Sequence, residues 1–174
     1  FELPQPAPDS PVWALAASCV DTVLEALTID YPEKNRRAAV QAGVALVCSQ
    51  LLRSIGFCFV WSGEIRKIGT ISSLLEILDL LCGPRGCSCD AVLESIKGAK
   101  EALLLTLARL CGHDVLPHVA TKSAKLLLKF CRCARSPSKL HQDEGFHRAF
   151  LVTGMPLILV QSMLGSVLDE DAAG

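Results

Sequence analysis

Asp30-Tyr-Pro-Glu-Lys-Asn-Arg-Arg-Ala-Ala-Val-Gln-Ala-Gly-Val-Ala-Leu-Val-Cys-Ser-Gln-Leu-Leu52 is the stretch that decides the fold. Pro32 presets a turn and suits the start of a helix, and Gly43 marks a helix end. Apolar residues then recur at roughly helical spacing, at Val44, Leu46, Val47, Leu51 and Leu52. The stretch therefore predicts a turn, a short helix over 35–42, a glycine break and a second helix.

This order of turn, short helix, Ala-Gly break and Leu-rich helix resembles the armadillo repeat. The positions that carry the resemblance are Pro32, Asn35, Arg36, Ala38, Val40, Ala42, Gly43, Leu46, Val47, Leu51 and Leu52. A weaker copy occupies Arg148–Gln161, where Gly154 follows Gly43 by 111 residues, and a third copy is placed at Ile65–Leu78 around Gly69. The resemblance implies an all-α, right-handed superhelical stack of about three to four irregular armadillo-like or HEAT-like repeats.

The composition suits helices packed on helices. The chain has 174 residues, of which 51% are hydrophobic and only 5% aromatic, enough for one domain with its own core. We expect this domain to span residues 10–168, between an extended lead-in at 1–9 and an acidic tail at 169–174. Ser54–Gly63 is expected to be a packed connector or a short helix. Further helices are predicted from Ser10 to Leu27, from Ile71 to Leu81, from Asp90 to Cys111 with a weak point at Gly98, and from Pro117 to Ala134.

Charge and cysteine content narrow the class of protein. Lys and Arg number 17 against 18 Asp and Glu, a net charge of −1 that argues neither for nor against nucleic acid. Nine cysteines, an odd number lying mostly in apolar runs, favour free thiols and hence the cytosol or nucleus. The apolar region 38–61 is interrupted by Gln50, Arg53 and two glycines, so no transmembrane helix is expected. Because the chain starts at Phe1 without a signal peptide, we expect a segment of a longer protein.

One predicted helix carries a basic stripe. Its members, at 3-4-3 spacing on one helix face, are Lys122, Lys125, Lys129 and Arg132. The opposite face is predicted to be apolar and to consist of Ala120, Ala124, Leu127, Leu128, Cys131 and Ala134. The stripe predicts a docking surface for an acidic peptide, a partner's acidic helix or a phosphate backbone. A solvated helix face would show the same pattern.

The resemblance adds Arg109 to this candidate partner-binding set. Armadillo proteins that clamp extended peptides carry Trp and Asn late on the third helix of a repeat, and Arg109 falls roughly where that Asn would be. Near the start of the chain the residues at this place are Glu25 and Ile29, so the peptide-clamping ladder is missing. A groove carrying Arg109 could still bind an acidic ligand, and an ordinary salt bridge explains this arginine equally well.

The sequence lacks the residue patterns required for metal binding or catalysis. The candidate metal ligands are Cys82, Cys87, Cys89, Cys111, His113 and His118. Their spacings, C-x4-C-x-C and C-x-H-x4-H, match none of the usual zinc-ligand pairs. No G-x-S-x-G elbow, phosphate-binding glycine loop or H-E-x-x-H pair is present. We therefore expect no catalytic residue, no metal, no cofactor and no enzymatic activity.

The expected function is a non-enzymatic protein-interaction or scaffold module that docks a partner segment on its helical surface. The partner is expected to be a protein, such as an acidic peptide or helix, and nucleic acid is not favoured. No membrane interaction is expected, and the oligomeric state is left open. Two alternatives remain: a helical assembly domain with an obligate partner, and a nucleic-acid-associated helical-repeat module that uses the basic face.

Overall fold

The structure is a computed structural model that describes residues 11–62, 68–83, 89–111 and 117–134. Every regular element within these ranges is helical: α1 (Pro11–Thr28), α2 (Pro32–Gln41), α3 (Val44–Ser62), α4 (Ile68–Leu81), α5 (Cys89–Ser95), the 3-10 turn η2 (Lys97–Ala99), α6 (Lys100–Arg109) and α7 (Pro117–Ala134). The predicted all-α class is confirmed for these residues. The expected lead-in, the acidic tail and the repeat copy at Arg148–Gln161 lie outside them.

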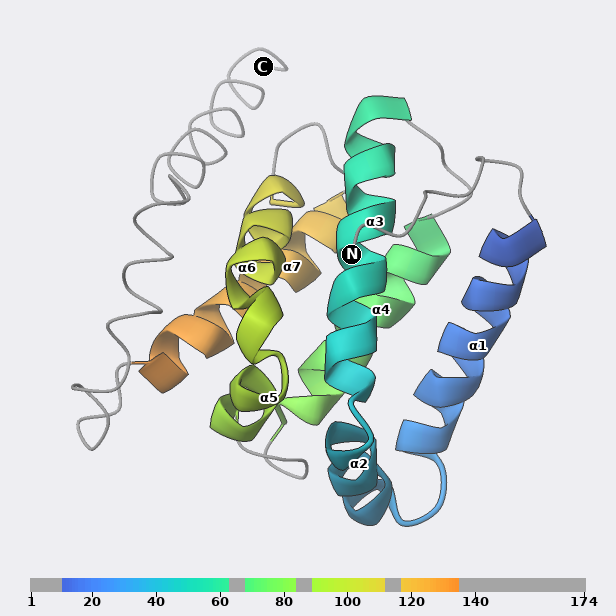
Figure 1. The fold of residues 1–174 in the computed structure, drawn as a ribbon, viewed down its shortest axis with the longest axis vertical. Helices are drawn as coiled ribbons and strands as arrows, with labels where there is room; N and C mark the ends of the chain where they lie inside the picture. The colour runs from blue at the N-terminus through green and yellow to red at the C-terminus, as the bar shows by residue number, and fades with distance from the viewer. Residues whose placement is uncertain (1–10, 63–67, 84–88, 112–116, 135–174) are drawn as a thin grey trace, which may run out of the picture.

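The long helices form two layers (Figure 1). α1, α4 and α7 lie in a row in that order, with α4 in the middle. α3 and α6 lie side by side in the second layer, where α3 packs on α4 and α6 packs on α7. The short helices α2 and α5 contact each other at one end of the molecule. We call α1, α4 and α7 the helix row.

α4 is central because apolar residues occupy several of its sides. Its buried residues, each at most 1% exposed, are Ile71, Leu74, Leu75, Ile77, Leu78 and Leu81. Their spacing covers more than one helix face, so α4 packs against α1, α3 and α7 at once. Fully burying one such side chain stabilises the fold by roughly 1.5–3 kcal/mol. The predicted helix Ile71–Leu81 is confirmed, and it begins three residues earlier, at Ile68.

Two side chains of α2 hold the end of α1. The amide nitrogen of Asn35 donates a hydrogen bond to the carbonyl oxygen of Ala26 at 2.8 Å. Nε of Arg36 donates to the carbonyl oxygen of Leu27 at 3.3 Å. Both carbonyls belong to the last turn of α1, where a helix leaves its acceptors without internal partners. Asn35 and Arg36 therefore fix the path of the chain from α1 into α2.

Gly43 makes the break between α2 and α3. Its φ of +79° lies in the left-handed region, which residues with a Cβ rarely adopt. The N–H of Gly43 donates to the carbonyl of Val40 at 3.1 Å and closes α2, and α3 then leaves at 73° to α2. The predicted order of turn, short helix, glycine break and second helix is confirmed.

Two expectations about the following segments are wrong. α3 continues as one helix to Ser62, so residues 54–62 form no separate connector or short helix, and Gly63 lies outside the described residues. The third repeat copy at Ile65–Leu78 required a helix break at Gly69. Instead α4 starts at Ile68 and includes this glycine as its second residue, and residues 65–67 lie outside the described residues. A glycine with an ordinary helical φ does not end a helix, so the residue type alone was misleading.

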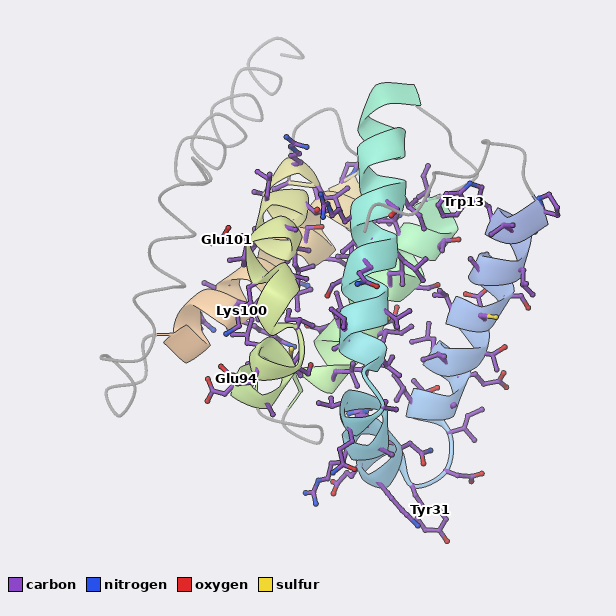
Figure 2. All side chains as sticks on the ribbon, in the orientation of Figure 1. Trp13, Tyr31, Glu94, Lys100 and Glu101 are labelled. Carbon is purple, nitrogen blue, oxygen red and sulfur yellow. The ribbon has the colours of Figure 1, made fainter. Side chains whose placement is uncertain are left out.

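The later helices follow the prediction closely. The segment predicted from Asp90 to Cys111 is divided into α5 and α6, and Gly98 lies in η2 between them. Lys100 and Glu94 form an ion pair of 3.3 Å across this turn (Figure 2). α7 runs from Pro117 to Ala134 as predicted, because proline suits the first turn of a helix.

Candidate functional site: the α4–α7 face

The buried face of α7 differs from the predicted one. It consists of Val119, Ser123, Leu126, Leu127 and Phe130. Of the residues predicted to be apolar and buried, Leu127 is buried, whereas Ala124 is exposed and Leu128 is 49% exposed. The side chains of Cys131 and Ala134 lie outside the described residues. Val119 and Phe130, which the predicted face omitted, are both fully buried. The buried face of α7 therefore lies closer to the basic stripe than predicted.

Two lysines of the stripe consequently lie at the border of the buried face and bind α4. Nζ of Lys122 donates to Oγ of Ser72 at 2.8 Å and pairs with Oε2 of Glu76 at 3.0 Å. Nζ of Lys129 pairs with the carboxylate of Asp79 and lies 3.4 Å from the carbonyl oxygen of the same residue. Lys122 and Lys129 therefore connect two helices of the row, and their charges are compensated within the fold.

The polar side of α4 was missed in the sequence. Besides its contacts with α7, α4 reaches α1, since Oγ of Ser73 donates to Oδ1 of Asp21 at 3.1 Å. A signal was present: Ser72, Ser73, Glu76 and Asp79 recur at helical spacing in a helix that is otherwise apolar. This spacing marks a polar edge, and the structure shows that the edge joins α4 to both neighbours.

The other two members of the stripe differ from these lysines. Lys125 and Arg132 are exposed, and neither forms an ion pair with another described residue. They are separated by two helical turns, about 10 Å along the helix axis, and the half-exposed Leu128 lies between them in sequence. We call Lys125, Leu128 and Arg132 the α7 patch. It presents two positive charges with an apolar side chain between them.

Arg109 belongs to α6, whereas the basic stripe belongs to α7. It is the last residue of α6, is exposed, and makes no ion pair with the residues that the structure describes. α6 lies beside α3 and not in the helix row. Its expected position on a third helix therefore does not fit the neighbours that α6 has, and its part in partner binding stays a prediction.

The expected cysteine-rich loop is only partly described. Cys82 and Cys89 are buried on either side of it, and Sγ of Cys89 lies 3.6 Å from the carbonyl oxygen of Cys82. Cys87 and His113 lie outside the described residues. Within the described ranges, no group of three or more His, Cys, Asp or Glu side chains could hold a metal ion.

The thiols of two cysteines are unreactive because they are buried. Burial raises the pKa of Cys48 to about 12 and that of Cys111 to about 11, both from 9.0. The thiolate is the nucleophilic and metal-binding form of cysteine, so these thiols are neutral and unreactive near pH 7. In contrast, Cys19 is exposed on α1.

A shallow depression lies beside α2. It measures about 670 Å³ and is lined by Tyr31, Pro32, Glu33, Lys34, Arg37, Ala38 and Gln41. Tyr31, at 80% exposed, points away from the molecule at the turn before α2 (Figure 2). The lining combines one acidic and two basic side chains and pairs no nucleophile with a base, so it contains no catalytic arrangement.

α1 is long and apolar enough to cross a membrane, by length and composition alone. The bent pair Pro32–Gln41 and Val44–Ile55 passes the same test when taken together. Core helices of soluble proteins have the same composition, so the indication is weak. Only 11% of α1 is buried, however, and much of its apolar surface is therefore open. The absence of a membrane interaction stays a prediction.

No protein-family model, curated protein or solved structure shows a significant match to this chain. The likeness of Asp30–Leu52 to an armadillo repeat is thus a likeness of residue pattern. The function is inferred from the residues and their geometry.

Proposed function

We propose that this chain is a non-enzymatic protein-interaction module built as a right-handed stack of armadillo-like repeats. The observation that carries the proposal is the order of neighbours: α2 meets α5, α3 meets α6, and α4 lies between α1 and α7. In this assignment α2, α3 and α4 form one repeat and α5, α6 and α7 form the next. α1 is the third helix of a preceding repeat. Stacks of this kind present side chains of successive helices as one extended contact surface.

The step between corresponding helices supports this assignment. The step is 57 residues from Pro11 to Ile68 and from Pro32 to Cys89, 56 from Val44 to Lys100, and 49 from Ile68 to Pro117. These steps are unequal and longer than the roughly 40–47 residues of regular armadillo and HEAT repeats, so the proposed repeats are irregular. The 111 residues between Gly43 and Gly154 correspond to about two such steps and not to three short ones. In Figure 1, α1, α4 and α7 run in the same general direction with increasing inclination, as a twisting stack requires.

The α7 patch is the part of the helix row best suited to a partner. The polar groups of α4 and the charges of Lys122 and Lys129 already hold the row together. Lys125 and Arg132 remain for a ligand, and Leu128 adds an apolar contact between them. An acidic helix with two carboxylates about two turns apart and an apolar residue between them complements this arrangement. Exposed ion pairs contribute roughly 0.2–1 kcal/mol each, so the charges provide selectivity more than affinity.

Nucleic acid fits the patch less well. A protein that binds the phosphate backbone tightly makes about 6–10 phosphate contacts. Among the described residues of α7 only two basic side chains are uncompensated. No exposed aromatic side chain is described on α7 to stack with a base. A protein ligand is therefore the better match.

A pull-down with a matched control tests the proposal. The first variant carries Lys125→Glu and Arg132→Glu. The control carries Lys34→Glu and Arg37→Glu, which make the same charge change at two exposed residues of α2. We expect protein partners from cytosolic and nuclear extracts to be lost with the first variant, to be retained with the control, and to resist nuclease.

Two outcomes would contradict the proposal. Equal retention of partners by both variants would exclude the α7 patch as the docking surface. Loss of the partners on nuclease treatment would favour nucleic-acid association instead. Circular dichroism and thermal unfolding of both variants verify that the fold is intact.

A further inference from the structure

α1 has a second, mostly apolar face that is exposed. Its inner residues, including Val20 and Leu27, are buried where α1 packs on α4 and α2. Six further residues are exposed: Val12 (54%), Leu15 (66%) and Ile29 (49%), together with Cys19, Thr22 and Ala26. α1 lies at the edge of the molecule (Figure 1). We call these six residues the α1 seam.

The spacing of the seam is that of a coiled coil. The six positions, 12, 15, 19, 22, 26 and 29, follow one another at intervals of 3, 4, 3, 4 and 3, the a and d positions of a heptad repeat. Ile29 continues the last turn, because its N–H donates to the carbonyl of Glu25 at 3.0 Å. The hydroxyl of Thr22 donates to the carbonyl of Ser18 at 2.9 Å and is thus satisfied within the helix. The seam therefore contains no charge and no hydroxyl in need of a partner.

We propose that α1 pairs with α1 of a second copy of this chain as an antiparallel two-helix coiled coil. The intervals of the seam read the same in both directions, so an antiparallel copy meets every position. In this register Val12 lies opposite Ile29, Leu15 opposite Ala26 and Cys19 opposite Thr22 of the second copy. Each a position meets a d position, and the large Leu15 meets the small Ala26, which lets the two helices interdigitate.

The residues beside the seam also favour an antiparallel second copy of α1. Ser18 lies opposite Glu25 of the second copy, so its hydroxyl can donate to that carboxylate. The two Glu25 side chains do not face each other. The other acidic residue of α1, Asp21, is bonded to Ser73 of α4. A parallel pair would instead place Ala26 opposite Ala26 and leave a gap in the seam.

The size of the contact determines how strong the dimer is. The seam spans 17 residue steps, about 25 Å of helix. One helix pair of this length lies at the low end of specific interfaces, below about 1,200 Å² in total. The dimer is therefore weak and depends on protein concentration. It is also independent of partner binding, because α1 and the α7 patch lie on helices at opposite ends of the helix row.

Sedimentation equilibrium over a series of protein concentrations tests the pairing. We expect a monomer–dimer equilibrium for the unaltered chain. Leu15→Glu should raise the dissociation constant by about a hundredfold, because it places a carboxylate in an apolar contact. Leu128→Glu, the matched change at a half-exposed leucine of α7, should leave the dissociation constant unchanged. At protein concentrations well below the dissociation constant, both variants should unfold at the temperature of the unaltered chain, since both positions are exposed.

The proposal is overturned if the unaltered chain stays monomeric at every concentration or if Leu15→Glu leaves the dimer intact. A dimer that both variants break would indicate head-to-tail contact between α1 and α7, which also overturns it.

A cross-link tests the register. Thr22→Cys should give a disulfide-linked dimer on oxidation, through Cys19 of the other copy, and adding Cys19→Ala should abolish it. A cross-link that forms through Cys19 alone in the unaltered chain would indicate a parallel pair and would overturn the antiparallel register.

Discussion

Two side chains of α2 cap the C-terminal end of α1. Asn35 and Arg36 belong to α2, yet they satisfy the carbonyls of Ala26 and Leu27 at the end of α1. A neutral hydrogen bond contributes about 1 kcal/mol net, and the loss is larger when an acceptor is left without water. The bond from Asn35 to Ala26 is exposed, so the smaller figure applies to it.

Removing the Asn35 amide should therefore cost a modest but measurable amount. We expect Asn35→Ala to lower the free energy of unfolding by about 1 kcal/mol, measured by urea denaturation. Lys34→Ala, an exposed neighbour on α2, is the control and should leave the midpoint nearly unchanged. Equal midpoints for Asn35→Ala and the unaltered chain would show that the contact with Ala26 does not hold α1.

Cys48 makes stability depend on pH in the alkaline range. Its folded-state pKa is about 12 against 9.0 for an ordinary thiol, so the unfolded chain loses its proton first as the pH rises. Stability from this group is therefore complete below pH 9 and declines between pH 9 and 12, by at most about 1.4 kcal/mol per pH unit. Urea midpoints on either side of pH 9 should fall less for Cys48→Ala than for the unaltered chain. Parallel declines would contradict this assignment.

For single residues, the sequence predicted the backbone roles of proline and glycine but not which charged side chains form ion pairs. Pro32 and Gly43 act through their own backbone dihedrals, which are local properties. The role of Lys122, in contrast, depends on its ion pair with Glu76, which lies 46 residues away in the chain. Spacing placed the stripe on one face of α7 but could not show which neighbouring helix would compensate two of its charges.

At the scale of elements, two glycines have opposite roles. Gly43 ends α2 with a positive φ, whereas Gly69 is the second residue of α4. A Cβ added at either position would meet no atom within 4 Å. Backbone conformation alone therefore decides the effect of a side chain there.

Alanine at the two glycines should accordingly change stability in opposite directions. We expect Gly43→Ala to destabilise the protein by about 1 kcal/mol, because alanine disfavours a left-handed φ. Gly69→Ala should stabilise it by roughly 0.4–1 kcal/mol, because alanine lowers the conformational entropy of the unfolded chain and fits the helical φ. Both values come from the same urea titration. Changes of the same sign would mean that the α2–α3 break or the start of α4 is placed wrongly.

The basic stripe of α7 divides into a structural and a free pair. Lys122→Glu with Lys129→Glu places new carboxylates beside Glu76 and Asp79, so the melting temperature should fall. The loss stays near 1 kcal/mol per pair, because both pairs are partly exposed. Lys125→Glu with Arg132→Glu should leave the melting temperature nearly unchanged. Equal shifts in a thermal melt would contradict the division.

Repeats were harder to predict than helices. The helix pattern is local, and the bounds of α7 and the division of α5 from α6 followed from Pro117 and Gly98. The repeat at Ile65–Leu78 failed because it relied on Gly69 as a break, and one residue type cannot distinguish a break from the first turn of a helix. The exposed face of α1 was also missed, since an apolar residue in a sequence does not show which side of its helix is covered.

At the scale of the whole molecule, the central claim is that α4 is the middle of the helix row, enclosed by α1, α3 and α7. Its buried residues are at most 1% exposed, whereas α1 is mostly open. Local opening is rarest where apolar contacts are most numerous, so α4 should belong to the most stable unit of the fold.

Amide hydrogen exchange measured along the chain by mass spectrometry tests this claim most directly. We predict that peptides from α4 exchange most slowly, near the rate of global unfolding, and that peptides from α1 exchange faster. If α4 exchanged as fast as α1, the helix row and the partner surface built on it would both be contradicted.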